Sequence, residues 1–128
     1  MILLWNSAEM EVELTFVDET KQDVVVWQAD RTLARDMLGF IRDELEKRGL
    51  GFGDIQGIGT FRGPGSFTGL RIGMTVLNTW ARADHIPIVG SADEEWKEIC
   101  LARLLAGMND EVVLPEYGAP ARTTKPRK

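Results

Sequence analysis

Residues that build disulfide frameworks and metal centres are scarce in this chain. Among 128 residues there is one cysteine, Cys100, and one histidine, His85. A single thiol excludes an internal disulfide and a zinc site of several cysteines, and a single imidazole excludes a site with two histidines. The single histidine also leaves only one base for Ser-His or Cys-His catalysis. The composition therefore predicts no metal site, and one unpaired thiol fits the reducing cytoplasm.

Long hydrophobic runs are also missing. The longest apolar runs, such as residues 24–27, are far shorter than the about 20 residues that a membrane helix needs. Residues 1–5 lack the basic flank of a signal peptide and are followed directly by polar residues. Both features favour a strand over a signal peptide. Apolar residues make up 44% and charged residues 27%, as is typical of one globular domain. We therefore expect a cytoplasmic domain that does not contact a membrane.

The net charge of −5 is unevenly distributed along the chain. Four cations, Arg122, Lys125, Arg127 and Lys128, lie at the end with no acid among them, so residues 1–121 hold 11 basic and 20 acidic residues. The acidic body is expected to repel nucleic acid, whereas the basic end could contact it. A solvated end that improves solubility is the alternative interpretation.

Hydrophobic alternation and β-branched runs predict strands, and apolar residues at spacings of three and four predict helices. The predicted strands are residues 2–5, 10–16, 24–27, 55–61 and 86–89. The predicted helices are residues 30–48, 69–83 and 93–105. Ser91 and Glu94 have the spacing of a capping box for the third helix, and residues 112–114 could pair as an edge strand.

The order of these elements, β-β-β-α-β-α-β-α, indicates the fold class. A three-strand meander followed by αβ units predicts an α/β fold with a mixed five-stranded sheet and helices packed on it. This is the order of a single ribonuclease H-like lobe. We assign the lobe to residues 1–106 and expect residues 107–128 to form an irregular basic tail.

A glycine-rich loop lies where the fourth strand meets the second helix. Its three glycines, Gly63, Gly65 and Gly69, surround the hydroxyl residues Ser66 and Thr68. Free backbone N–H groups and the helix dipole could bind an anion there, although the spacing matches neither a Walker A loop nor G-x-G-x-x-G. The alternative is that the glycines only allow a tight turn and close packing of the helix on the sheet.

The same loop carries a resemblance to a known family. Arg62-Gly63-Pro64-Gly65-Ser66-Phe67-Thr68-Gly69-Leu70-Arg71-Ile72-Gly73 resembles the signature of the TsaB (YeaZ) family, and residues 86–91 extend the likeness. The resemblance implies an actin-like ATPase lobe and a role in making threonylcarbamoyladenosine beside the tRNA anticodon. It also implies a TsaD partner that carries the metal and transfers the threonylcarbamoyl group, a TsaE ATPase in the assembly, and homodimers.

Two departures from the family pattern favour a binding role over catalysis. The family usually has two lobes, whereas this chain has room for one, and Asn6-Ser7 stands where the family usually has Asp-Thr. An asparagine lacks the charge that a hard cation prefers. We therefore predict a non-catalytic subunit without a cofactor, any ATP being bound by the partner. The alternatives are a small ATP or tRNA-phosphate binding module that uses the glycine loop and basic tail, and a protease, which one histidine supports poorly.

The second helix carries two apolar stripes, where a surface helix needs only one to meet its core. The second stripe, together with a phenylalanine that lies off the apolar face of the first helix, predicts an interface for a partner or a second copy. A central helix buried entirely within its own domain is the alternative. The predicted interface residues are Met37, Phe40, Ile41, Leu70, Ile72, Gly73, Met74, Val76, Leu77 and Trp80.

Overall fold

Among the described residues, five strands form one mixed sheet in the spatial order β3-β2-β1-β4-β5. They are β1 (Ile2–Asn6), β2 (Glu11–Val17), β3 (Gln22–Gln28), β4 (Gly57–Phe61) and β5 (Ile88–Ser91). The first three strands are antiparallel neighbours, whereas β4 runs parallel to both β1 and β5. This arrangement confirms the predicted α/β class and its mixed five-stranded sheet.

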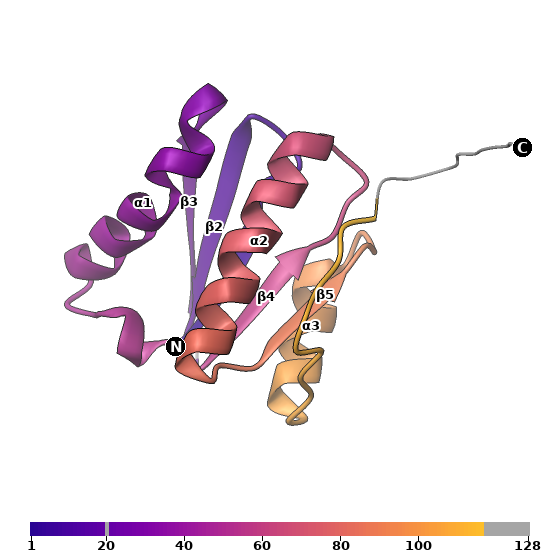
Figure 1. Ribbon diagram of the computed structural model, residues 1–128. Coiled ribbons are helices and arrows are strands. Elements are labelled where there is room, and N and C mark those ends of the chain that lie inside the picture. The colour runs from indigo at the N-terminus through magenta and orange to yellow at the C-terminus, as the bar shows by residue number, and fades with distance from the viewer. Residues whose placement is uncertain (20, 117–128) are drawn as a thin grey trace, which may run out of the picture.

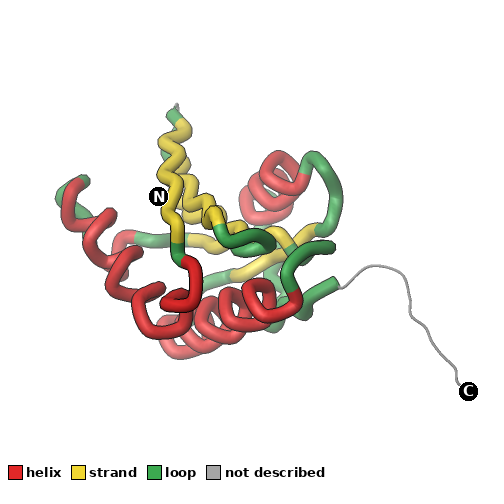
Figure 2. The backbone as a smooth tube through the Cα atoms, turned by 90° about the horizontal axis from the view of Figure 1, so that it is seen from above, coloured by secondary structure: helices red, strands yellow, loops and turns green. Residues whose placement is uncertain are grey.

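In the part of the chain that the structure describes, three helices cover the sheet. They are α1 (Leu33–Lys47), which follows a 3₁₀ turn at Asp30–Thr32, α2 (Phe67–Asp84) and α3 (Trp96–Leu105), and a second 3₁₀ turn spans Phe52–Asp54. The helices α1 and α2 lie side by side on one face, and α3 lies on the other (Figures 1 and 2). No helix among the described residues has the length and apolar content needed to cross a lipid bilayer.

The computed structural model describes residues 1–19 and 21–116. The predicted basic end, residues 122–128, therefore lies outside the described residues. Residues 107–116 contain neither helix nor strand, so the edge strand expected at residues 112–114 is absent. Their backbone nevertheless lies against the lobe, and the side chain of Val113 is buried in its core.

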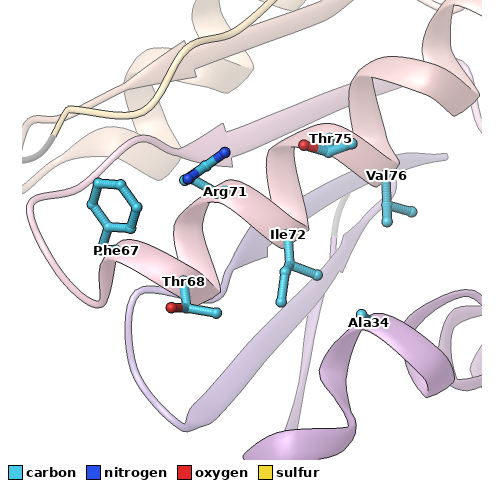
Figure 3. Close-up of a pocket in the computed structure, with 7 residues that line it drawn as sticks. All are labelled: Ala34, Phe67, Thr68, Arg71, Ile72, Thr75 and Val76. Carbon is cyan, nitrogen blue, oxygen red and sulfur yellow. The ribbon is translucent and has the colours of Figure 1, made fainter.

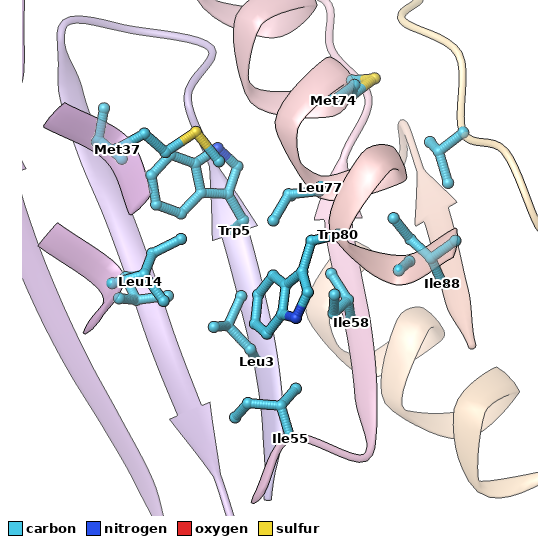
Figure 4. Packing of buried hydrophobic residues seen from close by; sticks show 14 of the residues in the cluster. Leu3, Trp5, Leu14, Met37, Ile55, Ile58, Met74, Leu77, Trp80 and Ile88 are labelled. Atoms are coloured by element: carbon cyan, nitrogen blue, oxygen red, sulfur yellow. The ribbon is translucent and has the colours of Figure 1, made fainter. Parts of the chain in front are cut away.

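Strand alternation divides the apolar residues between two cores. On β1, Leu3 and Trp5 point toward α1 and α2, where they pack with Met37 and Leu77 (Figure 4). The intervening Leu4 points to the opposite face and packs beneath α3. Because successive side chains of a strand point to opposite faces, a continuous apolar run is required where both faces are covered.

The start of α3 differs from the prediction. The helix begins at Trp96, and its N-terminus has no side-chain cap, so the predicted capping box of Ser91 and Glu94 is wrong. Ser91 is instead the last residue of β5, and its Oγ accepts the Asp93 N–H at 3.2 Å. The Asp93 carboxylate in turn accepts the Glu95 N–H at 2.9 Å. These side chains stabilise a turn, because short polar side chains satisfy nearby backbone N–H groups in turns as readily as in helices.

Candidate functional site

The N-terminus of α2 projects from the glycine-rich loop at the end of β4. The Ser66 Oγ caps the helix by accepting the Gly69 N–H at 3.3 Å, and the Ser66 N–H donates to the Ala8 carbonyl oxygen at 2.6 Å. The tip of the loop, residues 64–68, is exposed. The loop is thus tied to the turn between β1 and β2, although the two segments are far apart in the sequence.

Three glycines of the motif, Gly65, Gly69 and Gly73, lie at spacings of four where the loop and α2 pack directly against that turn. A Cβ atom added at Gly65, Gly69 or Gly73 would lie less than 3.0 Å from atoms of Ala8 or Ser7. Only glycine allows a backbone approach this close. The structure therefore supports the packing interpretation of these three glycines, while anion binding by the loop stays a prediction.

The polar residues at the end of β1 are engaged inside the molecule. The Trp5 indole Nε1 donates to the Ser7 Oγ at 2.9 Å, and the Ser7 Oγ donates to the Gly69 carbonyl oxygen at 2.8 Å. The Asn6 Oδ1 accepts the Ala8 N–H at 2.9 Å, which closes the turn. The Asn6-Ser7 pair thus holds the turn and anchors α2.

The two arginines that flank the loop have different environments. The Arg62 Nε donates to the Leu114 carbonyl oxygen at 2.8 Å, which ties β4 to residues 107–116. Arg71 is exposed on α2, and its guanidinium lies over the Phe67 ring at 5.1 Å. Arg62 therefore has a structural partner, whereas Arg71 and Phe67 form a cationic and aromatic feature on the surface.

A groove runs between α1 and α2. One end has a volume of about 340 Å³, where Ile72 and Val76 extend from α2 toward Ala34 of α1 (Figure 3). The other end has a volume of about 420 Å³ and is also lined by Val76, together with Leu38 of α1 and Phe52. We call this the α1–α2 groove. Its full lining is Ala34, Leu38, Phe52, Phe67, Thr68, Arg71, Ile72, Thr75, Val76, Thr79, Trp80, Ala83 and Asp84.

Most of the predicted interface residues lie elsewhere. The chain's own core buries Met37, Ile41, Leu70, Gly73, Met74, Leu77 and Trp80. Because α2 packs against both the sheet and α1, these side chains are unavailable to a partner, except that Trp80 also lines the α1–α2 groove. Phe40 is half-buried and stacks on Trp27, with ring centroids 4.5 Å apart. Only Ile72 and Val76 are both half-buried and in the groove.

Two exposed apolar residues of the groove, Leu38 and Phe67, are not indicated as interface residues by local sequence patterns. Leu38 is 47% exposed, although it fits the helical spacing of the apolar residues that predicts the core-facing side of the first helix. Phe67, which is 53% exposed, was treated only as part of the motif loop. Leu38 lies close to Phe52 and Val76 only because distant segments pack together. No local sequence pattern indicates that these residues line one groove.

Cys100 and His85, the two residues best suited to act as a nucleophile and a base, lie on opposite faces of the sheet. Cys100 lies on the buried, sheet-facing side of α3, and burial raises the pKa of its thiol to about 11. His85 is exposed at the end of α2, on the other face of the sheet, in a left-handed conformation with a φ of 58°. A Cys-His pair, one of the arrangements that a protease could use, is therefore absent from the described residues.

Comparison with known proteins identifies the family. Residues 18–92 match the model of the family described as "TsaD: tRNA N6-adenosine threonylcarbamoyltransferase". The chain belongs to this family. The matched stretch contains α1, α2 and the glycine motif, so it includes both helices of the α1–α2 groove.

Curated relatives and solved structures identify the TsaB (YeaZ) members as similar proteins. The chain is 32% identical over 90 residues to the tRNA threonylcarbamoyladenosine biosynthesis protein TsaB of Escherichia coli K12, a match that covers 63% of this chain and 39% of that protein. It is 34% identical over 61 residues to TsaB of Haemophilus influenzae, covering 48% of this chain and 26% of that protein. These matches confirm the resemblance to TsaB.

The solved structures agree. YeaZ from Pseudomonas aeruginosa superimposes with a TM-score of 0.65 at 26% identity, covering 72% of this chain and 43% of that one. A second structure, described as similar to peptidase YEAZ from the same organism, has a TM-score of 0.66. The likeness confirms the actin-like, ribonuclease H-like fold. The chain spans less than half the length of the relatives it matches.

Proposed function

We propose that this chain is a non-catalytic TsaB-like subunit that binds a TsaD-type partner through the α1–α2 groove. It would support the threonylcarbamoylation of the adenosine beside the tRNA anticodon, in the cytoplasm. The partner would carry out the transfer and bind any ATP, and a TsaE-type ATPase would be a further member of the assembly. Contact with tRNA would come through the complex or through the basic residues 122–128.

The observation that carries this proposal is the exposed apolar lining of the groove. Leu38 and Phe67 are each about half exposed, and Ile72 and Val76 extend into the space between the helices. Contiguous apolar surface of this kind is typical of protein interaction sites, since its exposure to water is unfavourable. Arg71 adds a cation at one end of the groove and Asp84 an anion at the other. Opposite charges at the two ends would orient a partner.

The end of β1 supports a non-catalytic role. In this family Asp-Thr usually stands where this chain has Asn6-Ser7. Here the Asn6 Oδ1 and the Ser7 Oγ hydrogen-bond to the chain's own backbone. Asn6 thus closes its own turn, and Ser7 anchors α2, so both groups are engaged within the chain.

Co-purification with the TsaD-type protein of the same organism tests the proposal. Two leucines provide a matched pair: Leu38 lies in the groove, and Leu105 is 80% exposed on α3, on the other face of the sheet. We expect Leu38→Glu to reduce recovery of the partner at least tenfold and Leu105→Glu to leave it unchanged. Thermal melting should show that both variants fold. Failure of the unmodified chain to bind, or equal binding by both variants, would overturn the proposal.

A further inference from the structure

The two edges of the sheet differ in how their backbone groups are satisfied. At the β5 edge, the Ile88 N–H donates to the Asn109 Oδ1 at 3.0 Å and the Ile88 carbonyl oxygen accepts the Asp110 N–H at 2.8 Å. The Gly90 N–H donates to the Asp110 Oδ2 at 3.1 Å, and the Gly90 carbonyl oxygen accepts from Arg103 at 3.0 Å. Segments that follow β5 therefore cover this edge.

The β3 edge has no such cover. The hydrogen bonds from Ala29 N–H to Met10 O and from Asp18 N–H to Lys21 O flank the β2–β3 ladder, and hydrogen-bonded pairs alternate along it. This phase directs the N–H and C=O groups of four residues away from β2. They are Gln22, Val24, Val26 and Gln28. Within residues 1–19 and 21–116, no group pairs with these outward backbone atoms.

The strand β3 also lacks the features that usually block an open edge. It pairs with β2 over all 7 of its residues without a bulge, and it contains neither lysine nor proline. Natural edge strands are commonly protected by such residues or by a bulge. The helix α3 packs against β4 and β5, so the side chains of β3 on the same face of the sheet are left bare (Figure 2). Val24 and Val26 are accordingly 47% and 53% exposed.

The two ends of this edge are acidic. The β2–β3 hairpin, residues 9–28, contains six acidic residues and one lysine, so its net charge of −5 equals that of the whole chain. Glu11 lies opposite Gln28, at one end of β3. Glu19 lies in the turn before Gln22, at the other end, and both glutamates are exposed without an ion pair in the part of the chain that the structure describes. Charge complementarity therefore favours a docked segment with a cation at each end.

A hollow on the α3 face meets the edge at Gln22. It has a volume of about 740 Å³, and Leu101 and Leu105 of α3 contribute apolar side chains to its lining. Lysine and arginine bury their aliphatic stems on such surface while the charged head stays in water. The lining contains one more acid than base, so the hollow suits a basic side chain. Its full lining is Met1, Ile2, Val17, Asp18, Glu19, Lys21, Gln22, Gln56, Leu101 and Leu105.

We propose that the β3 edge binds an extended segment of a partner protein that is apolar at its centre and basic at both ends. The segment adds a strand to the sheet, a mode of recognition in which backbone hydrogen bonds supply affinity and alternate side chains supply specificity. It runs antiparallel to β3, since antiparallel pairs are the more stable. Its apolar side chains pack on Val24 and Val26, and its basic ends lie near Glu11 and Glu19.

This edge is separate from the α1–α2 groove, whose lining contains no residue of β3. Both surfaces can therefore be occupied at the same time. The proposal goes beyond the proposed function, and it stands whether or not a TsaD-type protein binds in the groove.

Three capped peptides test the proposal by titration into the ¹⁵N-labelled chain. The first, Lys-Thr-Val-Thr-Val-Thr-Lys, places valines beside Val24 and Val26 and lysines at both ends. The second has N-methylvaline in place of both valines, which removes the two N–H groups that would donate to β3. The third has glutamate in place of both lysines. We expect saturable binding of the first peptide and at least tenfold weaker binding of the other two. No saturable binding of the first up to about 1 mM, or equal binding of all three, would overturn the proposal.

Hydrogen exchange and two charge variants locate the site. The Val24 and Val26 amides point outward, so the first peptide should slow their exchange at least tenfold, and it should change the Val25 amide, which faces β2, far less. Glu11→Lys should weaken binding at least threefold. Glu94→Lys, which changes the net charge equally but lies in the turn after β5, should leave it unchanged. Slow exchange of the Val24 and Val26 amides without peptide would show that a second copy or another part of the chain covers the edge, and would overturn the proposal.

Discussion

Ser7 donates a hydrogen bond of 2.8 Å from its Oγ to the carbonyl oxygen of Gly69, which joins the turn after β1 to the first turn of α2. The Ser7 Oγ in turn accepts the Trp5 indole N–H at 2.9 Å. This buried chain of hydrogen bonds is possible because Gly69 and Gly73 lack side chains. The motif most typical of the family thus positions α2, the helix that forms one wall of the α1–α2 groove.

The close approach of α2 predicts opposite effects for two glycine-to-alanine changes. A Cβ at Gly73 would lie less than 3.0 Å from Ser7 and Trp5, so Gly73→Ala should destabilise the fold by about 1–3 kcal/mol. Gly39 lies inside α1, where the nearest atom to a new Cβ is 3.8 Å away on Arg42. Gly39→Ala should therefore stabilise the fold by up to about 1 kcal/mol through helix propensity. Urea denaturation measures both, and similar destabilisation by both changes would contradict the packing described for α2.

The attachment of residues 107–116 depends on Asn78. Its amide Nδ2 donates to the Val113 carbonyl oxygen and its Oδ1 accepts the Val113 N–H, both at 2.9 Å. We expect Asn78→Ala to speed hydrogen exchange of the Val113 amide at least about tenfold, because a local opening loses two bonds of about 1 kcal/mol each. The control is Thr79→Ala, since the Thr79 hydroxyl bonds only to the Thr75 carbonyl within α2. Unchanged protection in Asn78→Ala would show that Asn78 does not hold the segment.

The buried carboxylate of Glu44 predicts a pH-dependent loss of stability. Burial acts to raise its pKa, but hydrogen bonds from Lys47 and Arg48 outweigh burial and lower the pKa from its ordinary value of 4.5. A lowered pKa in the folded state gives stability that is present above pH 4.5 and is lost as the pH falls through the folded pKa. Glu44→Gln should cost about 1–3 kcal/mol at pH 7 and progressively less below pH 4.5.

Denaturation at neutral and acidic pH measures this difference. Glu46→Gln is the matched control, because Glu46 is exposed on the same helix and forms no ion pair among the described residues. A difference between the unmodified chain and Glu44→Gln that stays constant down to pH 3 would refute the assignment.

The environment of Cys100 predicts slow thiol chemistry. Burial raises the pKa of its thiol from 9.0 to about 11, so its thiolate fraction at pH 8 should be about 100-fold lower than in the unfolded chain. We expect an aromatic disulfide reagent to modify the folded chain at least 100-fold more slowly than the chain in guanidinium chloride. Because the unfolded thiol ionises first, the fold should also lose stability above pH 9. Rapid modification of the folded chain would show that the packing of α3 on the sheet does not bury Cys100.

The order and type of the main elements follow from local patterns in the sequence. The alternation of β2 and the apolar spacing of α1 are properties of consecutive residues, so they are visible without the fold. Element boundaries depend on more than local pattern. The spacing of Ser91 and Glu94 predicts a capping box, but Ser91 ends β5 and its side chain stabilises a turn, since such side chains satisfy backbone N–H groups in both turns and helices. Residues 112–114 looked like an edge strand, yet their backbone is held by Asn78 and Arg62 side chains.

The sequence by itself determined the fold class and the family, because hydrophobic periodicity and a short motif are properties of neighbouring residues and can be recognised without the fold. Only the tertiary structure decided which face of α2 is core, since both of its apolar stripes look alike until α1 and the sheet cover one of them. Only the tertiary structure distinguished a covered sheet edge at β5 from an open one at β3. These properties depend on which segments meet in space, and contacts between distant residues leave no periodic signal in the chain.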